Sequence, residues 1–215
     1  MSLAAVEAAL APHRLCSMGG FHTRPDDAVP GGFETLLMVG PDEPAFWPHF
    51  TTSPEYQDGQ ADPLDRWSAR VLGEVAAQFE GAALFPFGGP PWHPFIGWAL
   101  KTGRAWVSPV ELLVHDRAGL FVSWRGALAL PGRLALPPVP LRPCDTCVEQ
   151  PCRAACPVAA LTPAGYDVPA CRAFIAGPEG AACIAEGCAV RRACPVGQGR
   201  RLPDQSAFHM KAFAR

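Results

Sequence analysis

The stretch CDTCVEQPCRAACP (residues 144–157) decides the fold of the second half of this chain. Its four cysteines follow the pattern Cys-x2-Cys-x4-Cys-x3-Cys and end on a proline. The chain has nine cysteines in 215 residues, and one of them, Cys16, precedes this stretch. The remaining four come after it and are Cys171, Cys183, Cys188 and Cys194, the last again followed by a proline. Eight thiols between positions 144 and 194 indicate a small module built around sulfur chemistry.

Disulfide bonds are the first chemistry to weigh for such a group of thiols, and the sequence argues against them. The N-terminal segment MSLAAVEAALAPHRL has no basic start and carries Glu7 in its apolar stretch, so it does not read as a secretory signal. We therefore expect a cytoplasmic protein, in which thiols stay reduced. The longest apolar runs are far too short to cross a bilayer, so no membrane association is expected. An odd ninth cysteine would also be left over.

Zinc and iron–sulfur clusters remain, and the spacing favours the clusters. Structural zinc sites use paired Cys-x2-Cys hooks, whereas here Cys144 and Cys147 form the one such pair. In two-cluster bacterial ferredoxins, three closely spaced cysteines hold one cluster and a fourth, followed by proline, ligates the other. Eight cysteines with two Cys-Pro endings, at Cys156 and Cys194, therefore predict two [4Fe–4S] clusters. Paired zinc sites stay open as the alternative.

The two prolines also predict that the two halves of the module share ligands. Proline fixes its own φ and lacks an N–H, so Pro157 and Pro195 turn the chain away from the loop that precedes them. Each preceding cysteine then lies on a departing segment and reaches the neighbouring cluster. The ligands predicted for the first cluster are Cys144, Cys147, Cys152 and Cys194. The ligands predicted for the second cluster are Cys156, Cys171, Cys183 and Cys188.

Composition and charge change at the Pro-rich stretch LALPPVPLRP (134–143). Residues 1–143 hold 10 Lys and Arg against 14 Asp and Glu, whereas residues 144–215 hold 8 against 6. We place a boundary in this connector, which gives an N-terminal domain at 1–138 and a cysteine domain at 139–215. The overall net charge of −2 gives no reason to expect nucleic acid as a partner.

The first domain alternates helix and strand signals. The spacing of apolar residues from Asp62 to Phe79 predicts an amphipathic helix. The segment 41–61 is polar and rich in proline, and we expect a long loop there. Strand patterns at 110–115 and 119–130, around the turn residues DRAG, predict a hairpin. The other expected elements are helices at 2–12 and 94–102 and strands at 14–22, 33–40 and 82–87. This mixed order predicts an α+β sandwich.

Three features together resemble one known family. They are the isolated Cys171 followed by a tighter cysteine group ending in Cys-Pro, the segment GRAWVSPVELLVHDRAGLFVSWRGALALP (103–131), and the segment EYQDGQADPLDRW (55–67). The family is that of the epoxyqueuosine reductases, the cobalamin-dependent enzymes of tRNA queuosine synthesis, and the resemblance runs from about residue 53 to 197. It implies a nitroreductase-like α/β sandwich domain followed by a small ferredoxin-like domain with two [4Fe–4S] clusters.

The chain also departs from the family that it resembles. The family's catalytic acid precedes a proline, whereas the equivalent stretch FPFGGPPWHPF (85–95) contains no carboxylate. Leu64 stands where the family has a histidine, and VSPVE (107–111) lacks the family's glycine and lysine. A protein without the proton donor is not expected to reduce epoxyqueuosine in the same way. We therefore expect a catalytically divergent relative.

The predicted function is electron transfer through two [4Fe–4S] clusters, with a redox donor such as flavodoxin or ferredoxin. Whether the chain is itself an enzyme stays open. One alternative is a complete reductase with a corrinoid (cobalamin) or flavin in the N-terminal domain, and another is a structural zinc module in an interaction protein. Candidate cofactor-binding residues are His93 and Trp106, although core packing is the default interpretation of such a tryptophan, and a lone loop histidine is more often structural or solvated. Arg191 and Arg192 are candidates for docking an acidic donor or raising a cluster's potential, with solvated arginines as the simpler interpretation.

Overall fold

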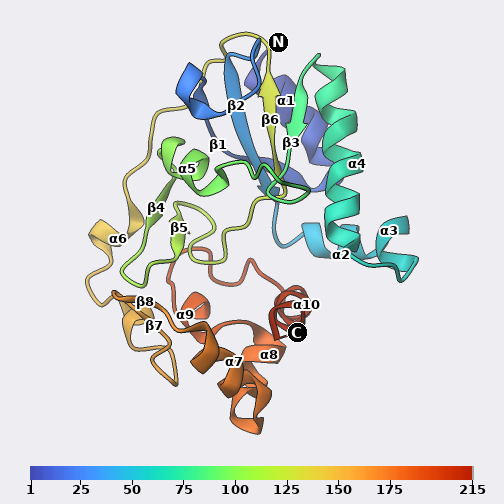
Figure 1. Cartoon of the computed structure of the whole chain (residues 1–215). Coiled ribbons are helices and arrows are strands. Elements are labelled where there is room, and N and C mark those ends of the chain that lie inside the picture. The colour runs from blue at the N-terminus through green and yellow to red at the C-terminus, as the bar shows by residue number, and fades with distance from the viewer. Residues whose placement is uncertain (215) are drawn as a thin grey trace. The chain divides into compact units, whose positions relative to one another are not determined.

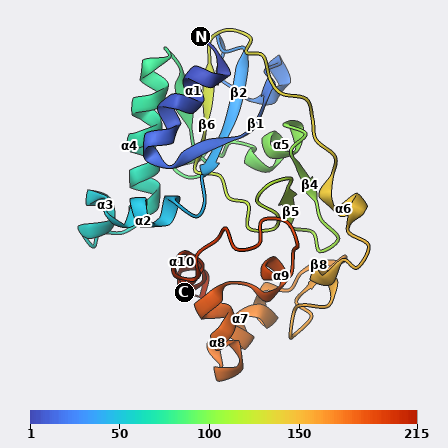
Figure 2. The same cartoon turned by 180° about the vertical axis from the view of Figure 1, so that it is seen from behind.

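The computed structural model describes residues 1–214 and shows a mixed α+β protein with small antiparallel sheets (Figures 1 and 2). The chain forms two compact units. The first unit comprises Met1–Arg104 and Ser123–Val139, and the second comprises Ala105–Val122 and the chain from Pro140 onward. The predicted boundary at residue 138 divides the chain only once, so it does not anticipate that Ala105–Val122 belongs to the second unit. Among the described residues, no helix combines the length and apolar character needed to cross a lipid bilayer.

A four-stranded antiparallel sheet forms the centre of the first unit, in the order β1-β2-β6-β3 (Figure 1). The strands are β1 (Leu15–His22), β2 (Thr35–Pro41), β3 (Ala82–Leu84) and β6 (Gly126–Leu130). β2 and β6 are buried along their whole length because they occupy the middle of the sheet. α1 (Leu3–Leu10) and α4 (Pro63–Gln78) cover one face of this sheet (Figure 2).

α4 confirms the predicted amphipathic helix to within a residue at each end. Its apolar residues recur at helical spacing, and the buried ones face the sheet. They are Leu64, Trp67, Val71, Leu72, Val75 and Ala76. The other helical segments of this unit are η1 (Ala11–His13), η2 (Pro25–Asp27), α2 (Phe46–Thr51), α3 (Pro54–Gln57) and α5 (Phe95–Lys101).

The prediction of a long loop at 41–61 was wrong, because α2 and α3 lie inside it. Aromatic packing explains the difference. The rings of Phe46 and Phe50 lie 5.5 and 5.7 Å from the Trp67 ring, and all three side chains are buried. Such edge-to-face contacts stabilise a short helical turn that its proline-rich sequence alone does not indicate.

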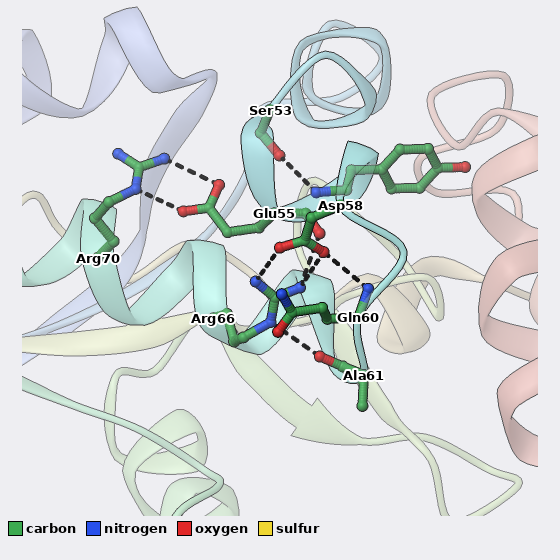
Figure 3. A network of polar contacts seen from close by, with 8 residues as sticks. Ser53, Glu55, Asp58, Gln60, Ala61, Arg66 and Arg70 are labelled. Carbon is green, nitrogen blue, oxygen red and sulfur yellow. Dashed lines mark hydrogen bonds and ion pairs between the residues drawn. The ribbon is translucent and has the colours of Figure 1, made fainter.

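Two arginines of α4 fasten the segment 55–61 to the helix (Figure 3). Arg70 Nε donates to Glu55 Oε1 at 2.6 Å, and Arg66 donates to both carboxylate oxygens of Asp58 at 2.8 Å. Arg66 also donates to the carbonyl oxygens of Glu55 and Ala61, each at 2.9 Å. The polar residues of the family-like stretch EYQDGQADPLDRW therefore stabilise the start of α4 in this protein.

The second unit contains little regular structure, and short helices connected by turns carry its cysteines. Its strands are β4 (Ala105–Val107), β5 (Leu113–His115), β7 (Leu161–Thr162) and β8 (Gly165–Tyr166). Its helical segments are α6 (Pro143–Thr146), η3 (Pro151–Arg153), α7 (Val168–Ala176), η4 (Pro178–Gly180), α8 (Ala181–Glu186), α9 (Ala189–Arg192) and α10 (Pro203–Ala214). β4 pairs with β5, and β7 pairs with β8, in both cases antiparallel.

The predicted hairpin between 110–115 and 119–130 was wrong. His115 and Gly119 exchange backbone hydrogen bonds of 3.1 and 2.9 Å, so DRAG does form a tight turn, but β5 pairs with β4 instead. The segment 119–130 is not one strand, because only Gly126–Leu130 is extended and it joins the sheet of the first unit. Gly126 allows this close packing, since a Cβ there would lie 2.6 Å from Leu72 Cδ1.

Candidate metal centre

Four cysteines from three parts of the second unit line a single pocket. Cys144 lies in α6, Cys147 ends that helix, Cys152 lies in η3, and Cys194 follows α9. Pro143 and Pro151 occupy the first positions of α6 and η3, where proline starts a helix without losing a hydrogen bond. We call Cys144, Cys147, Cys152 and Cys194 the first cysteine group.

The first cysteine group lies in apolar surroundings. Cys152 and Cys194 are each 8% exposed and pack in one core cluster with Val114, Leu120 and Val190. Burial raises the pKa of Cys152, and so do the neighbouring Cys144, Cys194 and Cys147. Burial also raises the pKa of Cys144, although the adjacent Arg142 guanidinium opposes the effect. Burial and the neighbouring thiols therefore disfavour the charged form of Cys144 and Cys152, and a cation beside them would offset this effect.

The remaining four cysteines of this unit form a second cysteine group, Cys156, Cys171, Cys183 and Cys188. Burial raises the pKa of Cys171, and so do Cys188, Cys156 and Cys183, which therefore lie near Cys171. Cys171 lies in α7, Cys183 lies in α8 and Cys188 precedes α9. Cys156 lies in the irregular chain between η3 and β7, so helices and loops together supply the second group.

Two sulfurs of the second cysteine group, those of Cys156 and Cys171, accept hydrogen bonds. The Ala160 N–H donates to Cys156 Sγ at 3.2 Å. The Tyr166 hydroxyl hydrogen-bonds to Cys171 and lowers the pKa of that thiol, against the larger effect of burial. The pKa of Tyr166 is raised, first by its own burial and then by this bond. Both contacts stabilise a thiolate, which is the form that binds metal.

Each group contains one cysteine from the stretch of sequence that supplies the other group. Cys156 is the fourth cysteine of the stretch 144–157, yet it lies with Cys171, Cys183 and Cys188. Cys194 comes last in the chain, yet it lines the pocket of Cys144, Cys147 and Cys152. Cys194 therefore lines one pocket with Cys144, Cys147 and Cys152, and Cys156 lies near Cys171, whereas the partition of the eight cysteines as metal ligands stays a prediction.

Four cysteines that line one pocket are the donor set of a single zinc ion or of a polynuclear cluster. Within residues 1–214, no three or more His, Cys, Asp or Glu side chains form a group that could hold a metal ion. The thiolates of one zinc ion must lie within about 4 Å of each other, since each Zn–S bond is about 2.3 Å. In the first cysteine group the four cysteines line one pocket. A polynuclear cluster would fill the space between such thiolates.

A buried donor next to the first cysteine group supports the same fit. Arg142 lies beside Cys144, and its Nη2 donates to the Val107 carbonyl oxygen at 2.7 Å. Its Nε is buried and has no hydrogen-bond partner among the described residues, because Asp145 Oδ1 is 3.9 Å away. A buried N–H normally has an acceptor. A cluster sulfide or ligand thiolate would supply one.

The structure does not bring the predicted cofactor-binding residues together in one unit. His93 belongs to the first unit, where its ring stacks on Trp98 with a centroid distance of 5.3 Å. Trp106 belongs to β4 of the second unit, opposite Val114, and packs against the core cluster there. Cys16 lies in β1, and its Sγ is 3.8 Å from both Met18 Sδ and the Pro41 carbonyl oxygen.

Sequence reasoning did not identify several residues around the cysteines. Arg142 lies beside the expected ligand Cys144, but nothing in the local pattern shows which way its side chain points. Gly119 was interpreted as a turn residue, and Tyr166 carried no motif. Their proximity to sulfur depends on long-range packing and has no local sequence signal.

Comparisons with known proteins do not identify a family for this chain. No protein-family model matches this chain, and no curated protein matches it in sequence.

Proposed function

We propose that this protein is an iron–sulfur electron-transfer protein with two [4Fe–4S] clusters. The observation that carries the proposal is the assembly of eight cysteines into two interleaved sets of four. Cys144, Cys147, Cys152 and Cys194 would hold one cluster, and Cys156, Cys171, Cys183 and Cys188 would hold the other. Such clusters, when bound, exchange single electrons at potentials set by charge, hydrogen bonds and exposure.

The surrounding residues support this assignment. The apolar side chains Val114, Leu120 and Val190 exclude water from the first group. Ala160 and Tyr166 donate hydrogen bonds to sulfurs of the second group. Arg142 places a positive charge next to Cys144. Thiolates and their hydrogen-bond donors are the means by which proteins bind and tune such clusters.

The fold family is part of the same proposal. The cysteine spacing and the segments 55–67 and 103–131 support a divergent relative of the epoxyqueuosine reductases, with a nitroreductase-like first domain and a ferredoxin-like second domain. The mixed α+β architecture with small antiparallel sheets is compatible with that assignment. A redox donor such as flavodoxin or ferredoxin, a cytoplasmic location and the absence of a nucleic-acid partner belong to the proposal as well.

The proposal assigns no epoxyqueuosine reduction to this chain. The segment 85–95 has no carboxylate, and its His93 is stacked on Trp98. A general acid needs a positioned donor of suitable pKa. Reduced protein with cobalamin and an epoxyqueuosine-containing tRNA stem-loop should therefore yield no product by mass spectrometry. Turnover at the rate of a family member would show that another residue supplies the proton.

The test of the main proposal is the metal content of protein purified without oxygen. We expect about eight iron and eight sulfide per chain, together with an S = 1/2 EPR signal after reduction. Zinc, cobalt and flavin are measured on the same sample, because zinc modules and corrinoid or flavin reductases are the competing functions. Stoichiometric zinc without sulfide would overturn the proposal.

A further inference from the structure

A basic pocket lies in the first unit, where β1 ends next to the helix α5 that packs against it (Figure 1). Its volume is about 240 Å³, slightly below the ~300 Å³ at which pockets for drug-sized molecules begin, so it suits a small ligand. We call it the β1 pocket. Its lining residues, all of which belong to the first unit, are Phe21, His22, Thr23, Arg24, Lys101 and Arg133.

Three separate segments supply the positive charges of the β1 pocket. Arg24 follows β1, Lys101 ends α5, and Arg133 follows β6. None of the described residues that line the pocket is acidic. Asp27 forms an ion pair with Lys101 and also lies near Arg24, so one carboxylate serves two of the three cations. Among residues 1–214 the Arg133 guanidinium forms no ion pair, so a positive charge is left for a ligand.

Hydrogen bonds fix the chain on both sides of Arg133. The buried Thr35 hydroxyl donates to the Gly132 carbonyl oxygen at 2.9 Å and accepts from the Leu134 N–H at 3.0 Å. His22 Nε2 lies 2.8 Å from the Leu134 carbonyl oxygen and donates to it, because a carbonyl oxygen only accepts. The backbone that carries Arg133 is therefore already ordered beside the end of β1, which lowers the entropic cost of binding.

Asp27 of η2 fastens the end of α5 to the segment that carries Arg24. The Arg24 N–H donates to Asp27 Oδ2 at 2.6 Å, and the Trp98 indole N–H donates to the Asp27 carbonyl oxygen at 2.7 Å. Lys101 donates to Asp27 Oδ1, and its Nζ lies 4.7 Å from the centre of the Phe21 ring. Burial alone would raise the pKa of Asp27, but the bond from Lys101, the Arg24 N–H and both positive charges lower it overall. Asp27 therefore stays ionised at neutral pH and holds Lys101 at the pocket.

We propose that the β1 pocket binds the phosphate group of a low-molecular-weight ligand. A terminal phosphate has three free oxygens and a charge of about −1.5 to −2 at pH 7. It therefore matches cationic donors from three segments better than a carboxylate does, which has two oxygens and one charge. Residues 1–143 hold 14 acidic against 10 basic residues, and this negative charge opposes a polyanion such as nucleic acid. Binding does not depend on a metal cluster, since the whole site lies in the first unit.

Calorimetry on the full chain, purified without oxygen, tests the binding at low ionic strength. Glycerol phosphate is the probe for a phosphate on a small molecule, and we expect saturable binding that weakens as salt is added. Inorganic phosphate should displace it, since recognition lies in the phosphate group. Succinate should bind about tenfold more weakly, because each carboxylate accepts fewer charge-assisted hydrogen bonds. Failure of inorganic phosphate to compete, or equal affinity for succinate, would overturn the assignment to a phosphate.

Arg133→Gln should weaken the binding of glycerol phosphate about tenfold, since a charge-assisted hydrogen bond is lost. The side chain is exposed, so the thermal midpoint should not change. Arg133→Lys should lose less affinity, because lysine keeps the charge. Arg14→Gln is the matched control, since Arg14 is an exposed arginine of the same unit that does not line the pocket. Equal weakening in Arg133→Gln and Arg14→Gln, or no saturable binding by the wild type, would overturn the proposal.

Iron and sulfide measured on the same samples separate this proposal from the electron-transfer function. Binding of glycerol phosphate to protein that holds no iron would support the phosphate site and overturn the electron-transfer function. A full iron content without binding of glycerol phosphate would overturn the phosphate site alone. Tighter binding of a single-stranded RNA oligonucleotide than of glycerol phosphate, again weakened by Arg133→Gln, would overturn the assignment to a small ligand.

Discussion

Gly119 lies directly against Cys194 in the second unit. A Cβ at Gly119 would stand 3.0 Å from the Cys194 sulfur and 2.1 Å from the Val196 carbonyl oxygen. The φ of Gly119 is +56°, so its backbone conformation also favours glycine. The segment Ala105–Val122 thus approaches the first cysteine group at a point where no side chain fits.

Gly119→Ala should therefore damage the first cysteine group. The added methyl group must push the chain away from Cys194 and Val196, at a cost of about 2–4 kcal/mol. We expect a lower thermal midpoint and a loss of about half the iron, measured on protein purified without oxygen. Gly199→Ala is the control, since Gly199 has a similar φ of +73° but no atom within 4 Å of an added Cβ. Equal losses in both variants would assign the effect to backbone strain.

Cys156→Ser and Cys152→Ser should remove different clusters, although the two residues are neighbours in sequence. Cys156 lies with the second group and Cys152 with the first. Each variant should keep about half the iron, and the EPR spectra of the two reduced variants should differ and add up to the wild-type spectrum. Cys16→Ser, outside both groups, should keep all of it. Identical residual spectra from Cys156→Ser and Cys152→Ser would contradict the exchange of ligands.

Arg142→Gln should lower the midpoint potential of the cluster beside Cys144. The guanidinium lies next to that sulfur, and positive charge stabilises the more negative reduced state. Its removal should shift the potential by on the order of −50 mV in an EPR-monitored redox titration. Arg142→Lys should keep most of the wild-type potential, because lysine retains the positive charge. Arg153→Gln removes an equal charge from an exposed site, so a similar shift in that variant would show that local charge is not the cause.

Glu55→Gln should make the first unit less stable at neutral pH and change how its stability depends on acid. The Arg70 guanidinium holds the pKa of Glu55 below its ordinary value of 4.5. The ion pair therefore contributes stability above that value and loses it as the pH falls through the lowered pKa. The Glu55 side chain is 12% exposed, and the loss at pH 7 should be on the order of 1–3 kcal/mol.

Denaturant unfolding followed by tryptophan fluorescence measures this difference, because Trp47 and Trp67 are buried in the first unit. The stabilities of wild type and Glu55→Gln should converge as the pH falls below about 4. Glu74→Gln provides the control, since Glu74 is 56% exposed and lies 3.5 Å from the same Arg70. A constant difference between wild type and Glu55→Gln at all pH values would show that the Glu55 charge is not responsible.

Local patterns predicted most of what is local in this fold. The helix α4 followed from apolar spacing. The assignment of Cys156 and Cys194 to opposite clusters, made from the prolines that come after them, stays a prediction. The partner of β5 could not be predicted in this way, because strand pairing depends on segments distant in sequence. For the same reason α2 and α3 were missed, since α2 packs on Trp67 of a later helix and Tyr56 of α3 packs on Phe50 of α2.

A pocket of the second unit that is lined by Arg191, Arg192 and Arg201 could likewise not be predicted in full. The sequence indicated Arg191 and Arg192 as candidate functional residues because they lie between two cysteines. It gave no such indication for Arg201, although Arg201 lines the same pocket. Its position depends on a hydrogen bond to Phe121, a residue of the distant segment Ala105–Val122. A single sequence carries no signal for such a contact.

The division of the second unit into two stretches of sequence sets an order of events during synthesis. Translation delivers Ala105–Val122, with Gly119 and Leu120, before any cysteine of either group, and it delivers Cys194 last. A nascent chain shorter than 194 residues can offer the first group three thiols at most. The first cysteine group can therefore be completed only after residue 194 has been made, when its apolar lining already exists.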